Sequence, residues 1–196
     1  LKVNADGRRF MNESGTYEGI IHSDECQKGH CHYSIFDATW TDFVQKTRMA
    51  GCSRLVPHPN GARPIFAWQF IESTILPKLI ADGFVQKADT IEELAEACGL
   101  PADELAKSVE TWNGFCEGGA DLAQYRPADS MVALDTPPFY AVKLTPCFLN
   151  TDGGPRRSAK AEILDVDGNP IAGLFSSGEF GSIHNFMYQG GDAAED

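Results

Sequence analysis

The sequence predicts an α+β fold in which helices occupy the middle of the chain and strands lie towards both ends. Two observations support this class. Two helical patterns with start and stop signals follow one another after residue 89, and strand patterns interrupted by turn residues occur before residue 39 and after residue 137. An order of strands, helices and strands is typical of α+β proteins.

Two strand patterns are expected near the N-terminus. Residues 1–13, LKVNADGRRFMNE, combine a short apolar alternation, an Asn-Ala-Asp-Gly turn and a returning segment, and they predict a β-hairpin. Residues 31–38, CHYSIFDA, predict an inner strand of a sheet. A helix can follow from Thr39 to Ala50, with Thr39 or Thr41 as its N-cap.

The next segment combines a loop with a strongly apolar helix. Residues 51–64 carry several proline and glycine residues, which predict a loop. Residues 65–83, IFAWQFIESTILPKLIADG, are apolar on nearly all sides of a helix. This pattern predicts a buried helix that is kinked or ended near Pro77.

Two amphipathic helices follow in the middle of the chain. Thr90 and Glu93 form a capping box, in which each side chain satisfies a free backbone N–H at the start of a helix, and Gly99 ends that helix. Pro101 opens the second helix. The apolar residues of the second helix share one face: Leu105, Val109 and Trp112.

The last part of the chain predicts strands again. Residues 121–138 are irregular, and residues 138–146, PFYAVKLTP, predict a strand. Residues 161–178, AEILDVDGNPIAGLFSSG, predict two strands joined by an Asp-Gly-Asn-Pro turn.

Composition and charge narrow the range of functions. The 196 residues are 42% hydrophobic, which is enough for one domain with its own core, or for one domain and a smaller piece. The net charge of −12 disfavours nucleic acid as a partner, because a phosphate-binding surface needs clustered Lys and Arg. No apolar run approaches the ~20 residues that a membrane-spanning helix needs. The six cysteines are scattered, lack a C-x-x-C pair, and are expected to be mostly reduced.

An ordered series of motifs resembles one enzyme family. The paired helices of residues 90–115, the strand PPFYAVKLTP, the TDGG turn and the segment AEILDVDGNPIAGLFSSGE are similar to the flavoproteins of fumarate reductases and succinate dehydrogenases. Soluble relatives of that family include urocanate reductase and 3-ketosteroid dehydrogenase. The resemblance implies a bacterial FAD-dependent oxidoreductase that acts on a small-molecule substrate, with an electron-donor protein as a candidate partner.

The resemblance also implies a division of the chain. Residues 1–148 match the capping domain, which closes over the flavin, and residues 149–196 match the last, β-rich strip of a Rossmann-type FAD domain. The glycine-rich turn that holds the FAD pyrophosphate is missing from the sequence, and Leu1 lies within a predicted strand. We therefore expect a fragment of a longer enzyme, which by itself is inactive and binds FAD weakly.

The last residues carry the positions that the resemblance assigns to FAD. Glu179, next to Gly178, matches a carboxylate that accepts hydrogen bonds from the sugar-alcohol chain of the flavin. Gly190 and Gly191 match a pair that lets the backbone approach the isoalloxazine ring without a Cβ. Three residues would then begin a helix whose N–H groups face the pyrimidine oxygens of the flavin: Asp192, Ala193 and Ala194.

The positions that hold a dicarboxylate in fumarate reductases differ in this sequence. At or near the family's arginines and histidine stand Thr41, Asn150, Tyr188 and Tyr17. None of these side chains offers the guanidinium fork that recognises a carboxylate. We therefore expect a less charged substrate, such as a cyclic or aromatic enone or enoate, with Tyr188 as the candidate acid or orienting hydroxyl.

Three further residues are candidates by position. Glu13, in the MNE motif, matches a family carboxylate in a proton path, and its alternative role is that of a hydrogen-bonded turn residue. Arg48 replaces the missing cation if its helix turns it inward. His184 matches a position close to the flavin, whereas His58 is expected to be a loop residue.

A rival hypothesis rests on the segment HSDECQKGHCH. His22, Cys26, His30, Cys31 and His32 lie close together in the sequence, and imidazole and thiolate ligands suit zinc or copper. Their spacing is not that of a standard zinc motif, so a solvated loop is favoured. A stand-alone binding module with a metal at this segment is nevertheless the alternative to the flavoenzyme.

Overall fold

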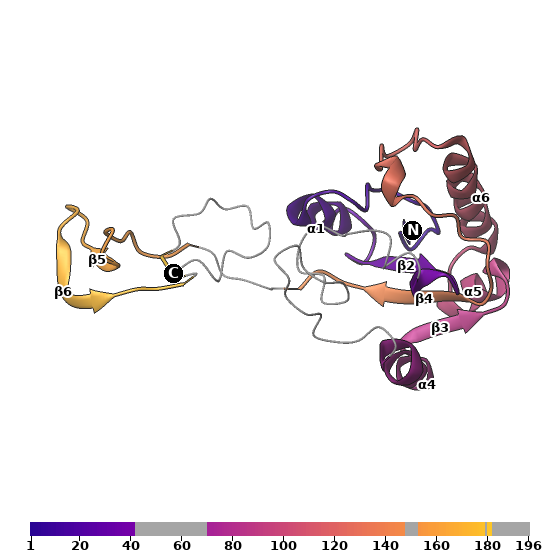
Figure 1. Ribbon diagram of the computed structural model, residues 1–196, viewed down its shortest axis with the longest axis horizontal. Helices are drawn as coiled ribbons and strands as arrows, with labels where there is room; N and C mark the ends of the chain where they lie inside the picture. Colours follow the sequence, from indigo (N-terminus) through magenta and orange to yellow (C-terminus); the bar gives the residue numbers. More distant parts are fainter. Residues whose placement is uncertain (42–69, 148–152, 179, 182–196) are drawn as a thin grey trace. The chain divides into compact units, whose positions relative to one another are not determined.

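The computed structural model describes residues 1–41, 70–147, 153–178 and 180–181, and its contacts divide the chain into two compact units (Figure 1). Unit 1 runs from Leu1 to Pro146, and unit 2 runs from Cys147 to Asp196. The mixture of helices and small open sheets confirms the α+β class.

Unit 1 is built on a four-stranded antiparallel sheet with the order β1-β2-β4-β3. The inner strands are β2 (His32–Phe36) and β4 (Phe139–Leu144), and the edge strands are β1 (Lys2–Val3) and β3 (Val85–Ala88). The inner strand predicted within residues 31–38 and the strand predicted within residues 138–146 are therefore confirmed.

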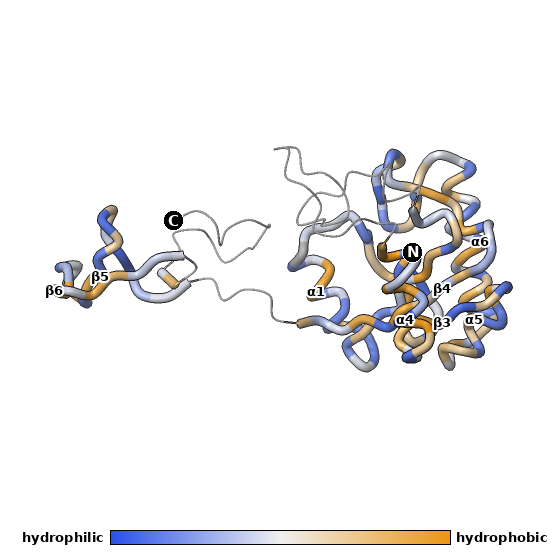
Figure 2. Tube along the Cα trace, turned by 60° about the horizontal axis from the view of Figure 1, so that its bottom comes forward, coloured by the Kyte–Doolittle hydropathy of each residue, from blue (hydrophilic) through white to orange (hydrophobic). Residues whose placement is uncertain are grey.

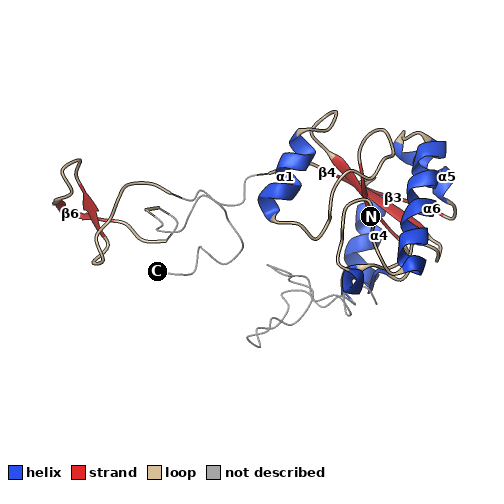
Figure 3. Cartoon of the chain, turned by 90° about the horizontal axis from the view of Figure 1, so that it is seen from above, coloured by secondary structure: helices blue, strands red, loops and turns tan. Residues whose placement is uncertain are grey.

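One face of the sheet packs against two helices to form the main core. These helices, α5 (Ile91–Cys98) and α6 (Ala102–Gly118), lie together beside the strands (Figure 3). The apolar face predicted for α6 is buried, as its spacing indicates. The largest fully buried side chains of this core are Trp112, Ile35, Leu94, Leu105 and Val3.

The ends of α5 and α6 follow the predicted signals. The Thr90 hydroxyl accepts a hydrogen bond from the Glu93 N–H at 3.1 Å, which confirms the threonine half of the capping box. Gly99 adopts φ +69° after α5, in the left-handed region that glycine enters without a Cβ clash. Pro101 directly precedes α6.

The other face of the sheet carries α4 (Leu76–Ala81), which follows a π-helical turn, η1 (Ile71–Ile75). Leu76 of α4 joins Val85 and Tyr140 in a second, smaller core. Apolar residues, orange in Figure 2, recur along the strands and the helices packed on them. The sheet of unit 1 is therefore covered on both faces.

The helix predicted over residues 65–83 differs from the expectation in its burial. Of its described residues, 70–83, only Leu76 is buried, and Phe70 is 47% exposed. Pro77 does not end the helix but stands in the first turn of α4, where the preceding π-turn accommodates the N–H that proline lacks. The prediction of a buried helix is wrong here because an all-round apolar pattern does not show what covers it.

The first residues form the predicted turn but not a full hairpin. The Asn4 N–H donates to the Arg8 carbonyl at 2.9 Å, and Val3 bridges Arg9. The returning segment does not continue as a strand, and β1 pairs with β2 instead. The strand partner of β1 is therefore the distant strand β2 and not the neighbouring segment after the turn.

Three short elements were not predicted. Thr16 caps α1 (Tyr17–Glu25) by accepting a hydrogen bond from the Gly19 N–H at 3.2 Å. The edge strand β3 and a 3-10 helix, η2 (Ala128–Ser130), complete unit 1. The helix expected from Thr39 to Ala50 falls almost wholly outside the described residues, as does the loop expected over residues 51–64.

Unit 2 contains the predicted β-hairpin, formed by β5 (Glu162–Leu164) and β6 (Pro170–Phe175). The Asp165 carboxylate organises its turn by accepting N–H hydrogen bonds from Asp167 and Asn169 at 3.0 and 2.8 Å. Every residue of β6 is exposed although the strand is largely apolar.

Candidate functional site

The candidate residue Glu13 lies in a buried ion-pair network of unit 1. Its two carboxylate oxygens accept hydrogen bonds from Arg9, from Nε at 2.9 Å and from Nη2 at 2.8 Å. The Lys2 backbone N–H donates at 3.1 Å, and Arg126 Nη1 donates at 3.4 Å. The Glu13 side chain is only 5% exposed, so protein groups replace its water.

Asp121 is the second carboxylate that binds the Arg9 guanidinium. Arg9 donates to both Asp121 oxygens, at 2.9 and 2.7 Å, so its guanidinium is shared between two carboxylates. Asp121 also accepts backbone N–H hydrogen bonds that fix the following loop, from Ala123, Gln124 and Arg126. The network thereby ties the turn after β1 to the loop after α6.

Trp112 of α6 supports both guanidinium groups. The Cζ atoms of Arg9 and Arg126 lie 4.7 and 5.4 Å from its ring centroid, within the range of cation–π attraction. The indole N–H donates to the Val132 carbonyl at 2.8 Å. The Trp112 ring therefore contacts both arginines of the network, and its N–H holds the neighbouring 131–134 segment at Val132.

The network keeps Glu13 ionised. Burial opposes the charged form, but the Arg9 hydrogen bonds and the charges of Arg9 and the Leu1 amino group outweigh it and lower the pKa of Glu13 from 4.5 to about 2. The pKa of Asp121 is lowered as well, since Arg9 and three backbone N–H groups outweigh its desolvation. Both roles of Glu13, in a proton path and as a hydrogen-bonded turn residue, stay predictions.

Asp37 organises the end of β2, close to the candidate residue Thr41. Its Oδ1 accepts hydrogen bonds from the Thr39 N–H and hydroxyl at 2.9 and 2.7 Å. Its Oδ2 accepts from the Asp135 and Thr136 N–H groups, both at 3.1 Å. Thr41 itself is half-buried and follows this turn directly.

Aromatic rings gather at the same end of the strand. Phe36 stacks on Tyr140 with 5.0 Å between ring centroids, and Trp40 meets Phe36 edge-on at 6.5 Å. A small cavity of about 70 Å³ lies beside them, and its lining includes Thr39, Trp40, Arg126 and Ser130. Arg126, which pairs with Glu13, therefore lines the same cavity as Thr39 and Trp40, which directly precede Thr41.

Unit 2 carries the one candidate cofactor residue that the structure describes. Gly178 adopts φ +66°, and a Cβ added there would meet open space. Gly154 and Gly181 approach closely, because a Cβ on Gly154 would lie 2.8 Å from the Gly181 nitrogen. Apolar side chains of this unit are exposed, among them Leu174, Phe175 and Phe180. The role of Gly178 in binding FAD stays a prediction.

The other candidate residues fall outside the described part of the chain. These residues are Tyr188, Asn150, Glu179, Gly190, Gly191, Asp192, Ala193, Arg48, His58 and His184. Tyr17 is the first residue of α1. Sequence reasoning missed Arg9, Asp121 and Arg126, and no local signal marks them because Arg9 and Asp121 are 112 positions apart.

The three histidines of the rival metal hypothesis form hydrogen bonds with protein oxygens. His22 pairs with the Glu25 carboxylate at 3.1 Å, and His30 donates to the Glu25 carbonyl at 2.8 Å. His32 donates from Nδ1 to the Asp24 carboxylate at 2.8 Å. Among the residues that the structure describes, no three His, Cys, Asp or Glu side chains are grouped to hold a metal ion. Nor does any described helix have the length and apolarity to cross a membrane.

Comparison with known proteins identifies the family. The profile of the FAD binding domain family matches residues 1–193. The chain belongs to this family of FAD-binding flavoproteins. Its relatives are FAD-dependent oxidoreductases, and FAD is the cofactor of the family.

Two relatives and one solved structure show the extent of the match. The probable fumarate reductase Ifc3 of Shewanella frigidimarina is 31% identical over 100% of this chain and 28% of its own length. Digoxin reductase of Eggerthella lenta is 41% identical over 91% of this chain and 29% of its own. The open conformation of a flavocytochrome c3 fumarate reductase aligns with a TM-score of 0.66 and 29% identity, over 98% of this chain and 29% of that one. The chain thus spans less than a third of the length of these proteins.

Proposed function

We propose that the chain is the substrate-covering part, with a strip of the flavin domain, of an FAD-dependent reductase or dehydrogenase. Residues 1–148 form the capping domain in this proposal, and residues 149–196 form the strip. The single observation that carries it is the family match over residues 1–193. The division of contacts at residues 146 and 147 supports the proposed boundary.

The proposed reaction is hydride transfer to or from an activated carbon–carbon bond. When FAD is bound, its N5 atom supplies or accepts the hydride. Glu179, Gly190 and Gly191 would hold the flavin, together with Gly178, Asp192 and Ala193. Tyr188 would hydrogen-bond to the oxygen that becomes negatively charged, and Asn150 would orient the same group.

We further propose that the substrate is not fumarate. Thr41, Asn150 and Tyr188 carry no positive charge. The two guanidinium groups of the Glu13 network are already matched by two carboxylates, Glu13 and Asp121. The 41% identity to digoxin reductase, against 31% to the fumarate reductase, points the same way.

The full-length protein provides the test. It should purify with FAD, and its anaerobically reduced form should be reoxidised by an enone such as 2-cyclohexenone or an enoate such as cinnamate. A protein that contains no flavin, and that gains none on reconstitution with FAD, would overturn the proposal. The isolated chain should bind FAD weakly, because it spans only 28% of the length of the fumarate reductase relative.

A further inference from the structure

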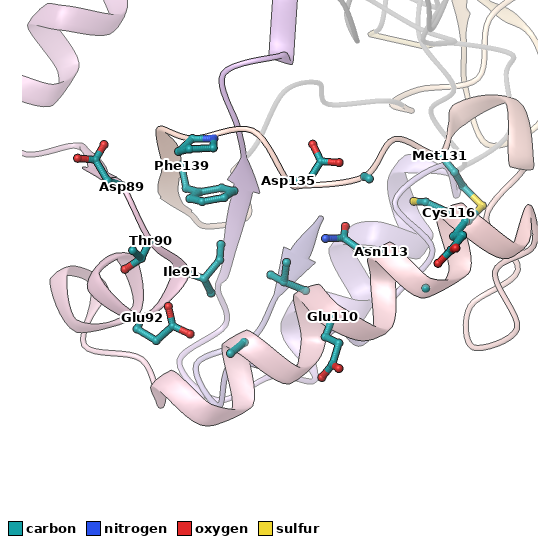
Figure 4. Close-up of a pocket in the computed structure, with 16 residues that line it drawn as sticks. Asp89, Thr90, Ile91, Glu92, Glu110, Asn113, Cys116, Met131, Asp135 and Phe139 are labelled. Carbon is teal, nitrogen blue, oxygen red and sulfur yellow. The ribbon is translucent and has the colours of Figure 1, made fainter.

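A groove lined by both apolar and polar side chains runs between α5, α6 and the 131–139 segment of unit 1 (Figure 4). Its volume is about 1210 Å³. Four of the side chains that line it are large and apolar: Ile91, Val109, Met131 and Phe139. Val109 and Phe139 belong to the main core, and Ile91 and Met131 pack against it, so the groove opens onto the core of the unit.

Carboxylates also line the groove. Sixteen residues line the groove, five of them acidic and none of them Lys, Arg or His. The acidic ones are Asp89, Glu92, Glu110, Glu117 and Asp135. Two exposed carboxylates outside the groove have cationic partners: Glu104 pairs with Arg8, and Asp82 pairs with Lys78. Among the described residues, none of the five groove carboxylates forms such an ion pair.

Hydrogen bonds fix the 131–134 segment against α6 on one side of the groove. Asn113 of α6 points towards the 131–139 segment, donates to the Leu134 carbonyl at 2.9 Å and accepts from the Leu134 N–H at 2.8 Å (Figure 4). The Trp112 indole holds Val132 at 2.8 Å. This side of the groove is therefore ordered before a partner binds, which lowers the ordering cost of binding.

We propose that this groove docks a cationic segment of a partner protein, with Lys or Arg facing the carboxylates and an apolar side chain seated over Ile91 and Met131. Charge complementarity selects this occupant. A second copy of the chain carries the same −12 charge and would be repelled, and nucleic acid is excluded by the same sign. The lining residues include neither Glu13, Arg126 nor Thr41, and the groove shares only Ala133 with the small cavity beside Trp40.

A designed peptide tests the proposal on the chain itself. The probe is a twelve-residue peptide of Lys and Leu, and the two controls replace its Lys by Glu or its Leu by Ser. Binding is followed by calorimetry and by amide chemical shifts at two salt concentrations. We expect the Lys/Leu peptide to bind more weakly at higher salt, to shift amides of α5, α6 and residues 131–139, and to bind more tightly than either control peptide.

Matched variants separate the groove from the net charge. Glu110→Gln with Glu117→Gln should weaken binding roughly fivefold, because two rim charges are lost. Glu72→Gln with Glu96→Gln removes the same charge outside the groove and should leave the affinity unchanged. Met131→Gln should weaken binding with little effect on the fold, checked by circular dichroism. Three results would each overturn the proposal: an equal loss of affinity in the two double variants, amide shifts away from the groove, or no binding of the peptide.

Discussion

The Arg9 guanidinium lies 4.7 Å from the centroid of the Trp112 ring while its N–H groups hold two buried carboxylates. Arg9 and its partner Glu13 come from the turn after β1, whereas Trp112 comes from α6. This one arginine therefore joins segments far apart in the sequence, in the part of unit 1 beside the candidate site.

Replacing Arg9 should destabilise the chain strongly. Arg9→Ala leaves Glu13 and Asp121 buried without their main counter-ion, which should cost about 3–5 kcal/mol of unfolding free energy. Arg8→Ala is the matched control, because its ion pair with Glu104 is exposed and should be worth under about 1 kcal/mol. Urea unfolding measures both variants. Equal losses for Arg8→Ala and Arg9→Ala would contradict the role assigned to the network.

The pH dependence of the unfolding free energy should reflect the ionisation of Glu13. Its pKa is lowered from 4.5 to about 2 in the folded chain, so its contribution is present above pH 4.5 and is lost as pH falls towards 2. That loss should reach about 3 kcal/mol at most. The measurement is the urea midpoint of unfolding as a function of pH between pH 5 and pH 2. This midpoint should depend less on pH in Glu13→Gln than in the unaltered chain, whereas Glu96→Gln should leave the dependence unchanged. A Glu13→Gln curve as steep as that of the unaltered chain would argue against a lowered pKa.

His32 should titrate below its ordinary value. Its burial disfavours the charged form and the Lys2 charge adds to this, so its pKa is lowered from 6.5 despite the Asp24 carboxylate. Because the folded value is the lower one, the stability that neutral His32 supplies is present above pH 6.5 and is lost as pH falls to the folded pKa. Proton NMR of the imidazole ring should give a midpoint below 6.5. A midpoint above that value would show that Asp24 dominates.

The cap of α5 should have a measurable effect. Thr90→Ala removes the oxygen that accepts the Glu93 N–H and should cost about 1 kcal/mol, whereas Thr90→Ser should restore most of it. Thermal unfolding of the two variants under one set of conditions provides the comparison. If serine and alanine are equally destabilising, the hydroxyl does not act as a cap.

Tyr188 should affect catalysis more than binding. In the full-length enzyme, Tyr188→Phe removes the proposed acid and should lower kcat roughly 10²-fold with little change in KM. Steady-state rates with a cyclic enone and a viologen donor measure both constants. A rise in KM at constant kcat would make the hydroxyl a binding group only.

The sequence predicted the elements whose signals are local. Thr90, Gly99 and Pro101 mark helix ends within a few residues, and the Asp165 turn fixes the β5–β6 hairpin in the same way. The edge strand β3 was missed because four residues give too short an alternation to recognise.

The candidate site depended on contacts that local patterns do not record. The partners of Glu13 include Arg126, which is 113 positions away. Only the folded chain shows that the guanidinium groups of Arg9 and Arg126 both lie near the Trp112 ring. The proposed roles of Tyr188, Asn150 and the flavin-binding glycines came from family resemblance, and they stay predictions.

Substrate specificity of the full-length enzyme tests the central claim most directly. The measurement is kcat/KM for fumarate against kcat/KM for 2-cyclohexenone and cinnamate, under anaerobic conditions with one electron donor. The account predicts a preference of roughly 10²-fold or more for one of the two less charged substrates, since uncharged Thr41, Asn150 and Tyr188 leave a dicarboxylate without its arginines. Turnover of fumarate as efficient as that of both alternatives, or more so, would contradict it.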